Sequence, residues 1–147
     1  MTPKNQYSEA NAASLKELTS FTAALTDSQL TTSMPANWTV SAVFVHLAFW
    51  DFRNITLIKK WLVEGVSASI NDVDVVNEAT RPFFIAVEPR QAVRLSLAYA
   101  HELDELIDSL EPAFIQSIED KGKSVWLDRS RHRNMHMSDI KNALGLK

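Results

Sequence analysis

Residues 38–51 read WTVSAVFVHLAFWD, and this stretch decides the fold class because its apolar residues repeat at a helical period. Thr39 is a candidate N-cap, since a threonine oxygen can accept a backbone N–H from the first helical turn. The pattern continues to Gly65, a residue typical of a helix end, so we predict one long helix over residues 40–64. Its predicted buried stripe comprises Val43, Leu47, Trp50, Leu57 and Trp61.

Three further helices are predicted around this one. The apolar spacing indicates the first over residues 6–26 and the last over residues 130–144, where Gly145 can end it. Between them, another helix begins at Pro89 and is closed by Pro112, because proline suits a first helical turn and interrupts a helix interior.

The segments between these helices complete the predicted architecture. Residues 66–88 form a long connection between the second and third helices, with a candidate short helix at residues 72–77. Residues 113–128 are expected to be irregular or mixed. Four helices with a long crossing predict an all-α four-helix bundle. At 147 residues, we expect one domain over residues 1–147.

Composition excludes several classes of protein. The chain is 46% apolar and 22% charged, as in ordinary globular domains. It has no cysteine, which excludes a disulfide framework, a thiolate metal site and a cysteine nucleophile. The beginning, MTPKNQYSEANAAS, lacks the apolar core of a signal peptide, and no apolar run is long enough for a membrane span. We therefore expect a soluble, cytoplasmic protein with no membrane partner.

Charge is unevenly distributed along the chain. The net charge is −3, yet residues 121–147 hold seven Lys or Arg against two Asp or Glu. Such a basic segment favours an anionic substrate or nucleic acid, or it faces water beside acidic neighbours. No recognised nucleic-acid motif interleaves the basic residues, so we expect no nucleic-acid partner.

Histidines are the chemically distinctive residues. His132 and His136 are four residues apart, so they leave the same helix face and can hold one divalent ion. Arg133 stands where a metalloprotease of the HExxH type needs its glutamate, which excludes that activity. His46 shares the inward helix face of Val43, whereas His101 lies on a charged face and is expected to be solvated.

Two segments resemble the DinB-like (YfiT-like) metalloenzyme family, which is related to the N-terminal domains of mycothiol-dependent maleylpyruvate isomerases. Residues 38–51 are similar to that family's helix W-[ST]-V…HLA-x-W-[DE], and residues 131–136, RHRNMH, are similar to its closing HxxxH helix. Asp74 and Asn77 also resemble the connection seen in those relatives.

The resemblance implies both a fold and a metal site. It implies an up-down-down-up four-helix bundle, frequently a homodimer, with one divalent ion that is often zinc or nickel. Carried over by position, the three ligands are His46, His132 and His136. Many members of the family use a low-molecular-weight thiol as co-substrate, and others are hydrolases.

Neighbouring residues complete the predicted site. Asp139 follows His136 by three residues and is a candidate to orient its ring, or an ordinary exposed helix aspartate; Asp51 is the weaker choice. Trp50 and Arg129 are candidate substrate-pocket residues. Arg129 would hold an anionic group, or it is a solvated arginine at the start of the helix.

These observations lead to one predicted function and an alternative. Three imidazoles with open coordination positions are typical of a catalytic metal site. The prediction is a metal-dependent hydrolase or thiol-dependent transferase or isomerase, which activates water or a low-molecular-weight thiol against a small organic substrate. The alternative is a non-enzymatic bundle that binds a small molecule or serves as a dimeric interaction protein.

Overall fold

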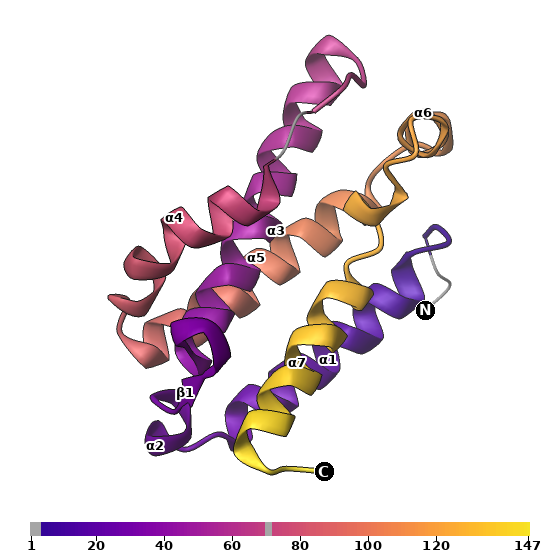
Figure 1. Ribbon diagram of the computed structural model, residues 1–147. Coiled ribbons are helices and arrows are strands. Elements are labelled where there is room, and N and C mark those ends of the chain that lie inside the picture. The colour runs from indigo at the N-terminus through magenta and orange to yellow at the C-terminus, as the bar shows by residue number, and fades with distance from the viewer. Residues whose placement is uncertain (1–3, 70–71) are drawn as a thin grey trace.

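The computed structural model describes residues 4–69 and 72–147, and these are mostly helical (Figure 1). The α-helices are α1 (Ser8–Ala24), α2 (Asp27–Leu30), α3 (Val40–Glu64), α4 (Val73–Ile85), α5 (Pro89–Asp108), α6 (Pro112–Asp120) and α7 (Ser130–Leu144). Short 3-10 helices are η1 (Pro35–Asn37) and η2 (Ser124–Trp126), and the strands are β1 (Ser33–Met34) and β2 (Trp38–Thr39). The predicted all-α class is confirmed, with this small antiparallel sheet as an addition.

The bounds of α3 and α7 agree with the predictions. Thr39 Oγ1 accepts a hydrogen bond from the N–H of Ala42 at 3.2 Å, which begins α3. Gly65 ends α3 with a φ of 88°, and Gly145 ends α7 in the left-handed region with a φ of 68°. Both glycines adopt backbone angles that other residues reach only with strain, so the two ends are set by local chemistry.

The segments between the long helices contain more helix than predicted. The candidate helix at residues 72–77 extends to the 13-residue α4, although Pro82 lies inside it. Residues 70–71 of that connection lie outside the described residues. Pro112 does not close a helix: α5 ends at Asp108, and Pro112 begins α6, because the first turn needs no proline N–H. The predicted irregular segment 113–128 therefore includes most of α6.

The four long helices pack in pairs. α3 packs along α5, α1 packs along both α5 and α7, and α4 lies against α3. α5 begins beside α2, where Arg90 Nε donates to Asp27 Oδ1 at 2.8 Å. It ends beside the N-terminal segment, where Asn5 Nδ2 donates to the carbonyl of Ile107 at 3.0 Å. In Figure 1, α3 and α5 both rise from the end that holds α2, whereas α1 and α7 descend toward it.

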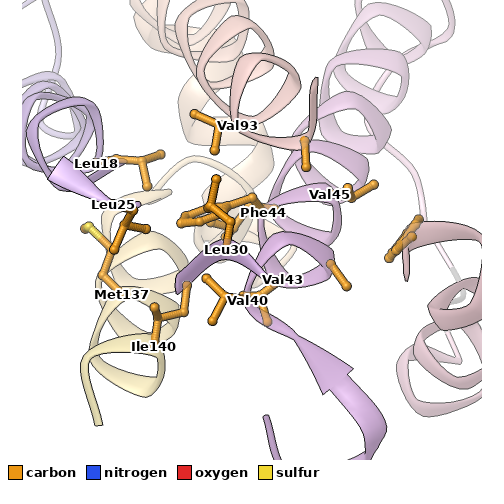
Figure 2. Packing of buried hydrophobic residues seen from close by; sticks show 14 residues of the cluster. Leu18, Leu25, Leu30, Val40, Val43, Phe44, Val45, Val93, Met137 and Ile140 are labelled. Atoms are coloured by element: carbon orange, nitrogen blue, oxygen red, sulfur yellow. The ribbon is translucent and has the colours of Figure 1, made fainter. Parts of the chain in front are cut away.

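Two apolar clusters form the core. The first lies near α2 and joins α1, α3, α5 and α7, as the side chains around Phe44 in Figure 2 show. The second lies at the other end and includes Ile58, Leu103 and Ile118, each fully buried. Of the stripe predicted for α3, Val43, Leu47, Trp50 and Trp61 are buried and Leu57 is half-buried. Burial of these clusters provides the main stabilisation of the fold.

A polar layer separates the two clusters along the helices. Its buried members are Asn11, Ser14, Asp51, Asn54, Ser96, Asp104, Arg129, Ser130 and Arg133. The guanidinium of Arg133 donates to both carboxylate oxygens of Asp104, at 2.7 and 2.9 Å. Burial raises the pKa of Asp104, and the hydrogen bond from Arg133 opposes that rise. The amide of Asn54 is buried and makes no hydrogen bond within the described residues.

Within residues 4–69 and 72–147, no helix combines the length and the apolar character needed to cross a membrane.

Candidate metal centre

The structure brings together the three predicted histidines. His46 comes from α3, and His132 and His136 come from α7, which packs against α3. One nitrogen from each ring lies within 4.8 Å of the others, and the Nε2 atoms of His46 and His132 are 3.2 Å apart. Donors bound tetrahedrally at zinc–nitrogen distances of 2.0–2.1 Å stand about 3.3 Å apart. The 3.2 Å pair matches that separation, and the third nitrogen is near enough to join one ion after the rings adjust.

Local sequence orients the individual rings, and the packing of α3 against α7 brings them together. His132 and His136 are one helical turn apart, with ring centroids separated by 4.8 Å. His46 lies on the inward face of α3 among buried residues, and its ring centroid is 4.7 Å from that of His136. The ring centroids of Trp38 and Trp50 lie 5.5 and 6.4 Å from that of His46, so aromatic packing restricts the imidazole.

Burial keeps the three imidazoles neutral. It lowers the pKa of His46 to about 3, and the electrostatic effect of a proton on His136, and then of the Arg129 cation, acts in the same direction. Burial lowers the pKa of His132 to about 2, and the nearby Arg129 adds to this effect. The pKa of His136 is also lowered by burial, although Asp139 opposes the shift. Neutral imidazole is the form that binds a metal ion, so near neutral pH no proton has to be displaced from a charged ring.

The ring nitrogens that face away from the centre have different partners. His136 Nδ1 is 3.5 Å from Asp139 Oδ2, and the Asp139 side chain is half-exposed, so the two groups are close and solvent screens their interaction. His46 Nδ1 is buried and has no hydrogen-bond partner within the described residues. The carboxylate of Asp51 is directed to another residue, Arg129, rather than to His46.

Arg129 is buried, which excludes the alternative of a solvated arginine. It is 3% exposed, and its Nε donates to Asp51 Oδ1 at 3.0 Å. Its Nη2 lies 3.0 Å from His132 Nδ1. Because a guanidinium only donates hydrogen bonds, His132 Nδ1 must accept and its proton lies on Nε2. The hydrogen bond between the Nε2 atoms of His132 and His46 then has His132 as its donor.

Sequence reasoning missed this chain of contacts from Asp51 through Arg129 to His132. The available signal was the spacing of three residues between Arg129 and His132, which places them on one helix face. The partner of Arg129 on α3 was not predictable from spacing, because it lies 78 residues away in the sequence. Loading an ion on His132 Nε2 requires the Arg129 contact to be released or the ring proton to leave.

Two cavities meet at the histidines. The Trp38 cavity has a volume of about 640 Å³ and is lined by Met34, Pro35, Trp38, Val43, His46, Asn77, His136, Asp139, Asn142 and Ala143. The Trp126 cavity has a volume of about 490 Å³ and is lined by His46, Trp50, Val73, Asn77, Val125, Trp126, Arg129, Arg131, His132, Met135 and His136. Both volumes fall in the range of small-molecule sites.

The remaining predicted residues lie in and around these cavities. Trp50 and Arg129 both line the Trp126 cavity. Trp50 Nε1 donates to Asn77 Oδ1 at 3.1 Å, and Asn77 lines both cavities at their boundary. Asp74 is exposed and lines neither cavity. His101 is exposed on α5, as expected for a solvated histidine.

Comparison of the chain with protein-family models, with curated proteins and with solved structures finds no match in any of the three. The functional assignment therefore depends on the geometry of the three histidines and the two cavities beside them.

Proposed function

We propose that the protein is a metal-dependent enzyme of the DinB-like type, with a divalent ion held by His46, His132 and His136. The observation that carries this proposal is the convergence of three neutral imidazoles from two helices where two cavities meet. Three protein ligands leave further coordination positions for water or substrate, which is the arrangement of a catalytic rather than a structural site.

The residues present fit such an ion. The three donors are nitrogens of the class that zinc and nickel accept, and burial holds them in the unprotonated form. A bound divalent ion would supply a water of lowered pKa or stabilise a thiolate. The chain has no cysteine, so a sulfur nucleophile would come from a low-molecular-weight thiol. We propose a hydrolase or a thiol-dependent transferase or isomerase acting on a small organic substrate.

The arrangement of the helices supports the proposed family. The parallel course of α3 and α5, with α1 and α7 opposed to them, is compatible with an up-down-down-up four-helix bundle. The long connection that contains α4 allows α5 to return to the end where α3 begins. As implied by the family resemblance, we also propose that the protein forms a homodimer.

One observation favours a second candidate, a binding module without catalysis. Arg129, His132 and His46 form a continuous set of hydrogen bonds without an ion, and only His46 Nδ1 has no partner within the described residues. In that case the two cavities would sequester a small molecule, and the histidines would be structural. The two candidates differ in their metal content and in turnover.

Elemental analysis of the untagged protein tests the proposal. We expect about one equivalent of divalent metal per chain, either as purified or after addition of zinc or nickel and gel filtration. Anomalous scattering at the metal edge should place the ion between His46, His132 and His136. The variant His101→Ala removes an exposed histidine and serves as the matched control, which should keep its metal.

Each ligand variant should behave differently from that control. His46→Ala, His132→Ala and His136→Ala should each lower the bound metal to a small fraction of an equivalent. Less than a tenth of an equivalent in the wild-type protein after addition of zinc or nickel would contradict the metal proposal. Stabilisation by small molecules without turnover of esters, amides or thiol acceptors would then support the binding module.

A further inference from the structure

The two cavities beside the histidines differ in charge. Arg129 and Arg131 line the Trp126 cavity, and no Asp or Glu within the described residues lines it. Asp139 lines the Trp38 cavity, and no Lys or Arg within residues 4–69 and 72–147 lines that one. A chemical difference between two compartments that share one centre indicates that they receive different molecules.

The two arginines of the Trp126 cavity have different roles. Arg129 is buried and its three guanidinium nitrogens donate to Asp51, to the carbonyl of Val125 and to His132. Asp51 also offsets its charge. Arg131 is exposed on the first turn of α7, so its charge lies at the cavity rim, where it can meet an anion with little displacement of other contacts.

The lining of the Trp126 cavity also includes an apolar and aromatic part. Trp50 and Trp126 line it together with Val73, Val125 and Met135. Arg53 lies over both indoles, with its guanidinium carbon 4.7 Å from the Trp126 ring centroid and 5.8 Å from that of Trp50. The cation is within cation–π distance of both rings and adds positive potential beside them.

We propose that the Trp126 cavity binds a hydrophobic carboxylate, with its apolar body against Trp50 and Trp126 and its carboxylate at Arg131. This inference rests on the proposed function, because the end of the molecule away from Arg131 would face His132 and His136, which line the same cavity. The Trp38 cavity, with Asp139 and two amides, disfavours a second anion and is left for water or an uncharged co-substrate. Because Arg129 is already paired with Asp51, the anionic group is assigned to Arg131 rather than to Arg129.

Calorimetry with a matched pair of ligands tests the assignment. The probes are 3-phenylpropionate and 3-phenylpropanamide, which share the apolar body and differ in charge. We expect the full-length protein, freed of metal by a chelator, to bind the carboxylate about three- to fivefold more tightly than the amide, in keeping with one solvent-screened ion pair. Metal-free protein is used because a carboxylate can also bind an ion directly, and the zinc-loaded protein is then compared.

Two pairs of variants locate the binding. Arg131→Gln should abolish the preference for the carboxylate, whereas Arg94→Gln, an exposed arginine on α5 that lines neither cavity, should keep it. Val125→Trp should fill the Trp126 cavity and lower the affinity at least tenfold. Ala143→Trp, in the Trp38 cavity, should leave the affinity unchanged. Val125 and Ala143 are both exposed, so both variants are expected to fold.

Several results would overturn the assignment. They are equal affinity for the two probes, no measurable binding of either, a carboxylate preference that survives Arg131→Gln, and loss of binding in Ala143→Trp with retention in Val125→Trp. A protein that binds no metal but shows the expected preference would contradict the metal proposal and leave this assignment standing, so the two failures are distinguishable.

Discussion

The polar layer and the histidine centre are two buried polar regions that adjoin each other and differ in how their groups are paired. In the polar layer, Arg133 binds Asp104 and Arg129 binds Asp51, so each buried charge has an opposite charge beside it. At the centre, three uncharged rings face one another where two cavities meet. Ion pairs within the protein produce structure, whereas neutral ring nitrogens beside a cavity are available for chemistry. Arg129 belongs to both regions.

Breaking a pair in the polar layer should give the largest effect. Arg133→Met removes the buried guanidinium and leaves Asp104 without its partner, which is expected to lower the free energy of unfolding by about 3–5 kcal/mol. Urea denaturation measures this change. The double variant Arg133→Met/Asp104→Leu should recover much of the loss, because no buried charge remains unpaired; equal losses in both variants would contradict this account.

Acid should act on the histidine centre more than on the polar layer. In the unfolded chain His46 has its ordinary pKa of 6.5, whereas in the folded protein its pKa is about 3. Between these values the unfolded state binds a proton that the folded state does not, so stability falls as pH decreases from 6.5 toward 3. At pH 5 this ring is expected to lower the free energy of unfolding by about 2 kcal/mol, and above pH 6.5 it is expected to have no effect.

The variant His46→Gln isolates that contribution. Its change in free energy of unfolding between pH 7 and pH 5 should be smaller than that of the wild type by about 2 kcal/mol. His101→Ala, which removes an exposed ring on α5, serves as the matched control variant. Identical pH dependence in His46→Gln and the wild type would show that the ring is not held neutral by burial.

Removing the hydrogen bond between Arg129 and His132 should show how the polar layer affects metal binding at the histidine centre. In Arg129→Gln/Asp51→Asn the buried charges are removed together, and the amide oxygen of glutamine can accept a hydrogen bond from Nδ1. His132 Nε2 is then free of its proton, and a cation no longer faces the ion. We expect zinc affinity to rise about tenfold, measured by competition with a chromogenic chelator.

Asp51→Asn alone controls for loss of the carboxylate and should not raise zinc affinity, because Arg129 still donates to His132. A double variant with zinc affinity equal to that of the wild type would contradict the coupling. Loss of the metal in the double variant would show that Arg129 supports the centre instead of opposing it.

Asp139 should give the smallest effect. Its carboxylate lies 3.5 Å from His136 Nδ1 and its side chain is half-exposed, so solvent screens the interaction. We expect Asp139→Asn to weaken zinc binding less than tenfold and to change stability by less than about 1 kcal/mol. The same competition assay measures the affinity; a hundredfold loss would show that Asp139 holds the ring as a required partner.

The parts of the fold that could be predicted are those set by local chemistry. Thr39, Gly65 and Gly145 place the ends of α3 and α7, because capping depends on a few neighbouring residues. α4 was underestimated because its interior proline opposes a helix, while burial of Phe84 in the first apolar cluster supports one. Pro112 is compatible with the end of one helix or the start of the next, and only the packing of α6 on the second cluster distinguishes them.

The candidate site likewise has features set by local sequence and features set by tertiary packing. By itself the sequence determined that His132 and His136 share a face and that His46 faces inward, because a helix of fixed period orients its own side chains. Only the tertiary structure decided that His46 meets His132 across 86 residues, that Arg129 turns inward to Asp51, and that two cavities of different charge meet there. These features depend on how α3, α4 and α7 pack together, and such contacts carry no periodic signal along the chain.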